Sequence, residues 1–144
     1  MIAVDTNILV YAHRAEMPWH EPAATRLSEL VESRAGWAIP WPCVHEFFGT
    51  VTQRRIFPRA STTDEALSFL TELLCSPGLV LLAEVDGYWD ALQDLVRSGR
   101  VVGPMVHDAR IAALCLVHGV SELWTADRDF GRFPRLKARN PLVD

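Results

Sequence analysis

Four acidic side chains lie where the predicted elements of this chain begin or end. Asp5 follows an apolar run at the N-terminus, and Asp127 comes two residues after a second run that ends at Thr125. Asp108 opens a helix that is apolar nearly all round, and Glu46 lies off the apolar stripe of another helix. If the four carboxylates converge, their like charges raise one another's pKa values, and a hard divalent cation relieves the repulsion.

The chemistry that such a cluster supports depends on its donor atoms. Oxygen ligands without His or Cys favour Mg²⁺ or Mn²⁺ over zinc. A cation held in this way polarises a phosphoryl oxygen and activates water for in-line attack on a phosphodiester. Simpler roles also fit the sequence: Asp5, Asp108 and Asp127 are each suited to cap a helix or turn, and Glu46 to face water.

Other chemistries find less support. The five histidines lack metalloprotease spacing, and the chain has neither a G-x-S-x-G motif nor a glycine-rich nucleotide-binding loop. Cys43, Cys75 and Cys115 are widely spaced and form no CxxC, so we expect three buried free thiols. An acid after the first strand is also typical of aspartyl-phosphate phosphatases and receiver domains. Both usually need a later lysine, and Lys137 lies nearly at the chain end.

The elements that must position these acids alternate along the chain. Apolar runs predict strands at residues 2–4, 37–39, 79–82 and 122–125. Helical spacing and caps predict helices after Asp5, around 23–31 and 44–51, from the Thr62–Glu65 capping box to 74, from Asp86 to about Gly99, and over about 106–118. Strands that alternate with helices and lack hairpin signals indicate an α/β fold with a central parallel sheet between helices. Ligands of such sheets bind at the carboxyl ends of the strands, where Asp5 and Asp127 lie.

Length and composition predict one globular domain over residues 1–144. Hydrophobic residues make up 49% and charged residues 22% of the chain, which suits a packed core. No apolar run approaches the roughly 18 residues of a membrane span, and the start lacks the basic region of a signal peptide. We therefore expect a cytoplasmic protein that does not associate with membranes.

Four segments together resemble the motifs of PIN-domain ribonucleases, most closely the VapC-type toxins of bacterial toxin–antitoxin pairs. They are MIAVDTNILVYA, CVHEFFGTV, HDARIAALCLVHG and LWTADRDFGRF, in the order found in that family. The resemblance implies a three-layer α/β/α sandwich and a metal-dependent endoribonuclease that uses Mg²⁺ or Mn²⁺. It also implies an RNA substrate, a homodimer, and a cognate antitoxin that blocks the cleft.

The resemblance also implies a role for each matching residue. Asp5 and Asp108 match the acids that chiefly hold the metal, while Glu46 and Asp127 complete the catalytic set. The supporting polar positions, which orient the acids or the attacking water, are matched by Asn7 and Thr125. Asp129 is close enough to Asp127 to be confused with it and ranks lower.

Two basic groups are candidates for contacts to RNA phosphates. Arg128 and Arg132 belong to a C-terminal group, and Arg54, Arg55 and Arg59 form a second, smaller one. Either group is also suited to a solvated surface.

Two alternative functions stay open from the sequence: a non-catalytic interaction module on the same fold, and a phosphatase-like phosphoryl-transfer enzyme. The net charge of −4 comes from 18 acids and 14 bases, so the four candidate acids equal the whole excess. The overall charge therefore argues only against binding nucleic acid without a metal.

Overall fold

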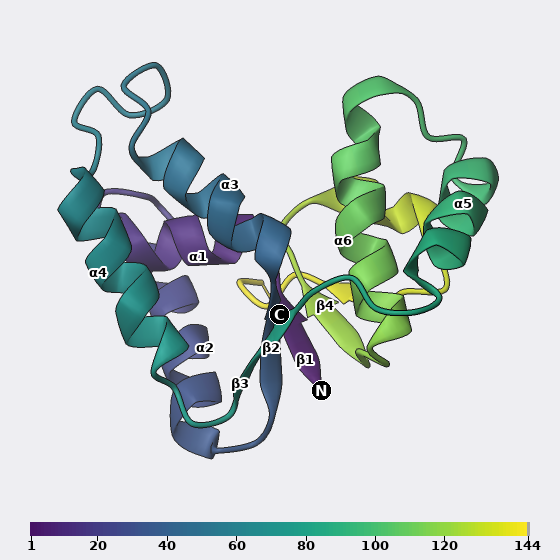
Figure 1. Cartoon of the computed structure of the whole chain (residues 1–144). Helices are drawn as coiled ribbons and strands as arrows, with labels where there is room; N and C mark the ends of the chain where they lie inside the picture. The colour runs from purple at the N-terminus through teal and green to yellow at the C-terminus, as the bar shows by residue number, and fades with distance from the viewer. Residues whose placement is uncertain (144) are drawn as a thin grey trace.

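The computed structural model describes residues 1–143 as a single five-stranded sheet with helices on both of its faces (Figure 1). The strands are β1 (Ile2–Val4), β2 (Trp37–Pro40), β3 (Leu79–Leu82), β4 (Glu122–Trp124) and β5 (Ala138–Arg139). The α-helices are α1 (Thr6–His13), α2 (His20–Ser33), α3 (Trp41–Val51), α4 (Thr63–Leu74), α5 (Tyr88–Ser98) and α6 (Val106–Val117). Two 3₁₀ helices complete the fold, η1 (Gly103–Met105) and η2 (Arg128–Arg132).

The sheet is parallel throughout, in the order β3-β2-β1-β4-β5. Helices α1, α2 and α4 gather on one side of it, and α5 and α6 pack together on the other (Figure 1). The predicted α/β class, with three layers and a central parallel sheet, is confirmed.

Strand β1 lies in the middle of the sheet, and both of its faces are covered. Ala3 and Val4 are completely buried, and β1 pairs with β2 on one side and β4 on the other. The chain thus leaves β1 toward one half of the sheet and returns later to the other half. Crevices at such a switch point, outside the carboxyl ends of the strands, are where open α/β sheets bind ligands.

All strands end at the same edge of the sheet, the upper one in Figure 1. Helices α1 and α3 begin directly after β1 and β2, and the first turn of α6 lies above the same edge. The backbone N–H of Asp5 donates to the carbonyl oxygen of Trp124 over 3.0 Å, which ties the end of β1 to the end of β4. This edge therefore brings together segments that lie far apart in the sequence.

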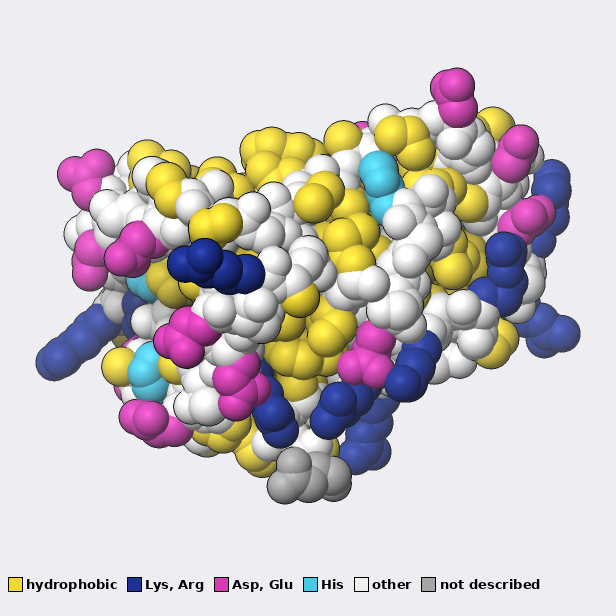
Figure 2. Space-filling view, turned by 90° about the horizontal axis from the view of Figure 1, so that it is seen from below, with side chains coloured by type: hydrophobic (Ala, Val, Ile, Leu, Met, Phe, Trp, Pro, Cys, Tyr) yellow, Lys and Arg dark blue, Asp and Glu magenta, His cyan; other side chains and the backbone are white. Residues whose placement is uncertain are grey.

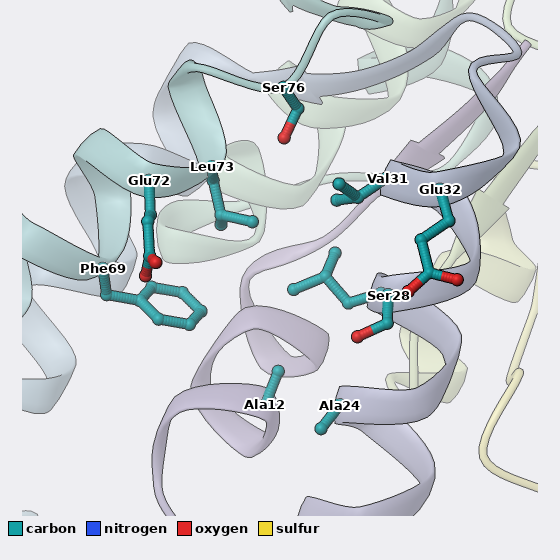
Figure 3. Close-up of a pocket in the computed structure, with 10 residues that line it drawn as sticks. Ala12, Ala24, Ser28, Val31, Glu32, Phe69, Glu72, Leu73 and Ser76 are labelled. Atoms are coloured by element: carbon teal, nitrogen blue, oxygen red, sulfur yellow. The ribbon is translucent and has the colours of Figure 1, made fainter.

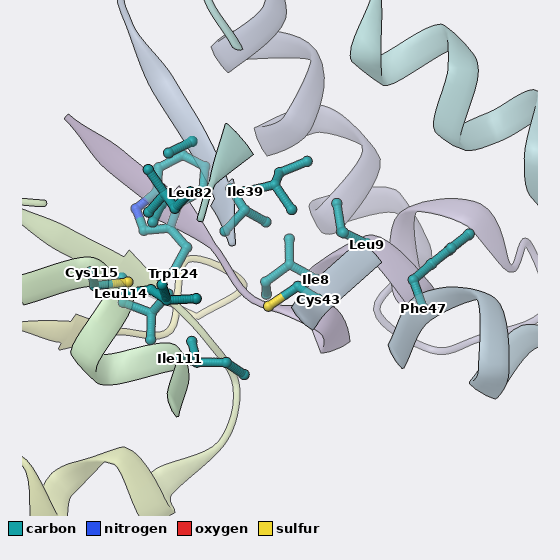
Figure 4. Close-up of a cluster of buried hydrophobic side chains, with 14 of the residues drawn as sticks. Ile8, Leu9, Ile39, Cys43, Phe47, Leu82, Ile111, Leu114, Cys115 and Trp124 are labelled. Atoms are coloured by element: carbon teal, nitrogen blue, oxygen red, sulfur yellow. The ribbon is translucent and has the colours of Figure 1, made fainter. Parts of the chain in front are cut away.

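The core lies between the sheet and its helices and fixes the position of α6. Ile111, Leu114 and Cys115 of α6 are almost completely buried and lie with Trp124 in the cluster drawn in Figure 4. On the other side of the sheet the same cluster includes Ile8 of α1. Residues 109 and 111–115 of α6 are buried, as expected for a helix of this apolar character, whereas its first residues, Val106 and His107, are exposed. This burial positions the first turn of α6 above the strand ends.

Two local predictions are wrong. Asp86 does not cap α5, because Gly87, with a left-handed φ of 90°, takes the cap position and the helix begins one residue later. Cys75 is exposed rather than buried: it caps the C-terminus of α4, away from the stripe of Ala66, Leu70 and Leu73. Cys43 and Cys115 are buried free thiols, as expected.

Figure 2 views the molecule from the edge where the strands begin. Hydrophobic side chains extend across the middle of this face, and Lys and Arg side chains gather toward its lower edge. Val80 of the edge strand β3 is 46% exposed. Within residues 1–143, none of the helices has the length and apolar character to cross a membrane.

Candidate active site

The four candidate acids line one cavity at the carboxyl edge of the sheet. The cavity has a volume of about 330 Å³, and its walls include Asp5, Glu46, Asp108 and Asp127. These residues come from the end of β1, from α3, from the first turn of α6 and from the segment after β4. The convergence that the sequence left conditional is therefore present in the structure.

Asp5 is the most firmly held of the four, with 4% of its surface exposed. Its Oδ1 accepts from the backbone N–H of Thr6 over 2.8 Å and from the Cys43 thiol over 3.6 Å. Its Oδ2 accepts from the Thr125 hydroxyl over 2.7 Å and from the Asn7 amide over 3.2 Å. Burial raises the pKa of Asp5 above its ordinary value, while the bonds from Thr125 and Thr6 lower it. Asp5 also caps α1, so the cap and the candidate site share one residue.

Thr125 and Asn7 orient the Asp5 carboxylate through hydrogen bonds. The Thr125 hydroxyl donates to Asp5 and accepts from the Asn7 amide over 3.1 Å and from the Asp127 backbone N–H over 3.0 Å. A hydroxyl has one donor and two acceptor sites, so all of them are in use. The Asn7 side-chain oxygen accepts from the backbone N–H of Ala126 over 3.0 Å. One network therefore joins the ends of β1 and β4 and orients Asp5.

Glu46 is positioned by a residue that the sequence reasoning did not select. The Thr6 hydroxyl donates to Glu46 Oε2 over 2.6 Å. Glu46 thus lines the cavity and is partly exposed, in agreement with its position off the apolar stripe of α3. The one signal available in the sequence was the position of Thr6 beside Asp5, at the carboxyl end of a buried strand.

Asp108, Asp127 and Asp129 form the densest acidic group. One carboxylate oxygen from each lies within 4.8 Å of those of the other two, which places them within reach of a single cation. Desolvation raises the pKa of Asp108 to about 6, and the charges of Asp127, Asp5, Glu46 and Asp129 add to the effect. Within residues 1–143, the start of α6 has no side-chain capping hydrogen bond, and its N-cap residue is Met105 rather than Asp108. Asp129, which ranked below Asp127, lies in this group with it.

Asp127 has a structural role as well. Its Oδ1 accepts from the backbone N–H of Asp129 over 2.8 Å and caps η2. The turn between these two residues therefore directs both carboxylates toward Asp108.

The two candidate arginines lie in different environments. Arg128 is exposed and lines a cavity of about 320 Å³ that also borders Asp127. Arg132 is half-buried, and its guanidinium donates to the carbonyl oxygen of Gly99 over 3.1 Å. Arg128 therefore lies exposed beside Asp127, whereas Arg132 ties η2 to the end of α5.

A separate cavity of about 380 Å³ lies between α1, α2 and α4 (Figure 3). Phe69, Leu73 and Val31 point into it, and Glu32 and Glu72 lie at its border. It has neither a candidate catalytic residue nor a cation in its wall. The acidic cavity is thus the place where the structure concentrates chemically active groups.

Comparison with known proteins agrees with this geometry. The family model described as PIN domain matches residues 2–136. VapC ribonuclease Mb2897 of Mycobacterium bovis is 33% identical over 142 residues, covering 99% of this chain and 96% of the relative. Ribonuclease VapC48 of Mycobacterium tuberculosis is 24% identical over 138 residues, covering 96% and 95%.

Solved structures share the fold at low sequence identity. VapBC2 from Rickettsia felis, bound to a DNA fragment from its promoter, has a TM-score of 0.67 at 22% identity and covers 96% of this chain and 98% of that one. VapC20 of Mycobacterium tuberculosis, a toxin that cleaves the sarcin-ricin loop, has a TM-score of 0.64 at 17% identity and covers 91% and 93%. The acidic cavity at the switch point, the matched domain and the near full-length relatives lead to one conclusion: this chain belongs to the PIN-domain family and, within it, to the VapC ribonucleases.

Proposed function

We propose that the protein is a metal-dependent endoribonuclease that acts as the toxin of a toxin–antitoxin pair. The observation that carries the proposal is the convergence of Asp5, Glu46, Asp108 and Asp127 on one cavity. A scaffold gains nothing from crowded carboxylates, since burial and then the neighbouring acids raise the pKa of Asp108 to about 6. The ribonuclease names of its relatives support the same activity.

The donor set of the cavity fits a hard divalent cation. Asp108, Asp127 and Asp129 offer carboxylate oxygens within 4.8 Å of one another, and Asp5 lines the same cavity. Oxygen ligands of this kind suit Mg²⁺ or Mn²⁺. We propose Asp5 and Asp108 as the chief ligands. Such an ion, when bound, lowers the pKa of water and offsets the charge that develops on the phosphate.

The residues of the chain supply orientation and proton transfer. Asp5 keeps a fixed direction because Thr6, Asn7, Thr125 and Cys43 all donate to it. Glu46, fixed by Thr6, is the carboxylate that we propose to accept the proton of the attacking water.

Contacts to the RNA lie beside these groups. Arg128, exposed next to Asp127, is placed to contact an RNA phosphate. The Arg132 guanidinium already donates to the carbonyl oxygen of Gly99. We therefore propose that Arg132 attracts RNA through its positive charge and does not contact a phosphate directly.

The choice between Mg²⁺ and Mn²⁺ is tested by metal titration. Calorimetric titration of the chelator-treated protein with each ion should give saturable binding that Asp108→Asn weakens strongly. Equal binding by the parent protein and this variant would remove Asp108 from the site.

The decisive experiment expresses the protein, incubates it with total RNA and Mg²⁺, and sequences the new RNA ends. Cleavage at defined positions, abolished in Asp5→Asn and in Asp108→Asn, is the expected result. Undiminished cleavage by either variant would overturn the assignment of the site. Turnover of a small phosphate ester without cleavage of RNA would instead indicate a phosphatase-like enzyme.

We propose two protein partners. Solved relatives include the VapBC-1 complex from Haemophilus influenzae and DNA-bound VapBC from Salmonella typhimurium, which support a cognate antitoxin for this chain. A gene for a small DNA-binding protein immediately upstream, whose product suppresses RNA cleavage, is the expected observation.

The second partner is another copy of the chain. Val85, Trp89 and Val102 are 46%, 65% and 71% exposed before, on and after α5, and a homodimer would cover some of this apolar surface. Sedimentation equilibrium measures the oligomeric state directly. We also propose that the protein acts in the cytoplasm, where its proposed RNA substrate is found.

A further inference from the structure

A second cavity adjoins the acidic one and is larger, with a volume of about 800 Å³ against about 330 Å³. It lies between the residues that follow α1 and the segment that joins α3 to α4. Figure 1 shows this joining segment at the upper left. Met17, Ile56 and Phe57 line both cavities. These three side chains therefore form a wall that the two cavities share. An extended ligand bound in the acidic cavity would have the second cavity directly beside it.

The shared wall is held rigidly by Arg14. Its side chain is 10% exposed and donates to the carbonyl oxygen of Arg59 over 2.8 Å and to the Ser61 hydroxyl over 3.0 Å. The guanidinium carbon also lies 4.3 Å from the centre of the Phe57 ring. On the same hydroxyl, His13 Nε2 makes a hydrogen bond of 2.8 Å with Ser61. A segment without regular structure is thus fixed in one conformation, which lowers the entropy cost of binding a ligand.

The lining of the second cavity combines apolar and polar groups. Ile56 is 51% exposed, and together with Met17 and Phe57 it offers an apolar surface. Glu16 and Glu65 add carboxylate acceptors, whereas the buried Ser61 hydroxyl is already bonded to Arg14 and His13. An unstacked nucleobase has the matching chemistry, with an apolar face and a polar edge.

Positive charge on the same segment suits the phosphates on either side of such a base. Arg54, Arg55 and Arg59 are all exposed. Within residues 1–143 their side chains form no ion pair or hydrogen bond, so they have no role in holding the fold. On the other basic segment, by contrast, Lys137 and Arg139 pair with Glu122.

We infer that the second cavity binds one unstacked nucleotide of single-stranded RNA, next to the phosphate that enters the acidic cavity. The base lies against Ile56 and Phe57, and the arginines of the 54–59 segment contact the flanking phosphates. The cavity is thereby a determinant of which RNA sequence is cleaved. This inference rests on the proposed ribonuclease function, but its test measures RNA binding separately from cleavage.

The test fills the cavity without altering the acids. Ala15 lines the second cavity only, is exposed, and has an ordinary negative φ, so Ala15→Trp is the filling variant. The matched control is Ala35→Trp, an exposed position between α2 and β2 at the opposite edge of the sheet. A second pair compares Arg59→Ala with Arg97→Ala on α5, which also removes an exposed positive charge, one whose guanidinium is 3.5 Å from Gln93 Oε1. Unchanged stabilisation by Mn²⁺ establishes that each variant is folded with its acidic site intact.

The measurement is fluorescence anisotropy with single-stranded RNA of about eight nucleotides, using Ca²⁺ in place of Mg²⁺. Ala15→Trp should weaken binding at least about fivefold, which corresponds to ~1 kcal/mol for one lost base contact. Arg59→Ala should weaken it by a similar factor at low salt and lower the salt dependence, whereas both controls stay within about twofold of the parent. RNA with abasic positions should bind the parent protein weakly, with an affinity similar to that of Ala15→Trp for RNA that carries all its bases.

Equal binding of base-bearing RNA by the parent and Ala15→Trp would overturn the inference, as would tight binding of abasic RNA by the parent. If Ala15→Trp weakens RNA binding but the parent cleaves no RNA, the cavity stands as a nucleotide site and the ribonuclease function fails. If the parent cleaves RNA, sequencing of the ends should show a base preference next to the cut that Ala15→Trp loses. An unchanged preference would indicate that this cavity serves a different ligand, such as a protein segment.

Discussion

At the level of single residues, Asp108 is held where its charge destabilises the fold. Desolvation and then four neighbouring acids raise its pKa from 3.8 to about 6. The first turn of α6 favours an anion, but typically by less than ~1 kcal/mol, which does not offset these effects. The folded protein therefore binds a proton at Asp108 more tightly than the unfolded chain does.

The sign of the resulting pH dependence follows from this raised pKa. The contribution of Asp108 to stability is fully present below about pH 4 and is lost as the pH rises through about 6. In metal-free buffer at pH 8, Asp108→Asn should raise the free energy of unfolding by ~1 kcal/mol, less than the full shift because the carboxyl is partly exposed. At pH 4 the variant and the parent should be alike. Urea unfolding at both pH values measures the difference, and an equal effect at each would contradict the electrostatic cause.

The Thr125 hydroxyl is expected to act on the metal through Asp5. Thr125→Val removes the 2.7 Å donor to Asp5 and the acceptor for Asn7 and Asp127 while it keeps the side-chain volume. We expect the affinity for Mn²⁺ to fall about 10- to 100-fold, the usual effect of losing such a supporting bond. Calorimetric titration provides the measurement.

Thr52→Val is the matched control for this substitution, because within residues 1–143 the Thr52 hydroxyl donates only to the carbonyl oxygen of Phe48, at the C-terminal end of α3. A similar loss of Mn²⁺ affinity in both variants would mean that Thr125 has no specific role.

At the level of elements, periodicity was sufficient for the helices and strands that bury one continuous face. The apolar residues of α6 and the capping box of α4 stand out in the sequence, and both are present in the structure. Predictions failed where a single residue's backbone decides the outcome, as at Gly87, whose left-handed conformation has no periodic signal. Strand β5, with only two exposed residues, has no apolar pattern to detect.

The candidate site was predictable to a similar extent. The positions of Asp5 and Asp127 in the site were predictable because parallel sheets bind ligands at the carboxyl ends of their strands. The bond from Thr6 to Glu46 joins residues 40 positions apart, and no local pattern reports such a contact. For the same reason, the wall shared by the two cavities appears only once the segment after α3 folds back beside the segment after α1.

Helix α4 offers a test of local stability that is separate from the acids. The Thr62 hydroxyl accepts from the backbone N–H of Glu65 over 3.1 Å, and the Glu65 carboxylate accepts from the backbone N–H of Thr62 over 3.0 Å. Thr62→Ala should lower the free energy of unfolding by ~1 kcal/mol. Thr71→Ala, at an exposed position within α4, should change it far less. Urea unfolding of both variants tests the assignment, and equal losses would contradict it.

At the level of the whole molecule, we expect the acidic cavity to make the stability of the fold depend on a divalent cation. The carboxylates of Asp5, Glu46, Asp108 and Asp127 meet in one place, so a bound cation relieves repulsion that the empty fold must tolerate. At about 100 times its dissociation constant, Mg²⁺ or Mn²⁺ should stabilise the protein by ~2.7 kcal/mol. For a chain of this length that corresponds to a rise in Tm of roughly 5–10 °C, which EDTA should reverse.

Two controls separate binding at the site from general screening of charge. NaCl at the same ionic strength weakens repulsion between exposed charges but forms no bonds to the acids, so its effect on Tm should be much smaller. Asp108→Asn should start from a higher metal-free Tm at pH 8 and gain little from the cation, since one ligand and part of the repulsion are both gone. A higher metal-free Tm and a smaller gain in Tm with the cation are expected together in one variant only if the same carboxylate both destabilises the metal-free fold and binds the ion. A variant that keeps the full gain with Mg²⁺, or a parent that responds equally to NaCl, would place the cation elsewhere.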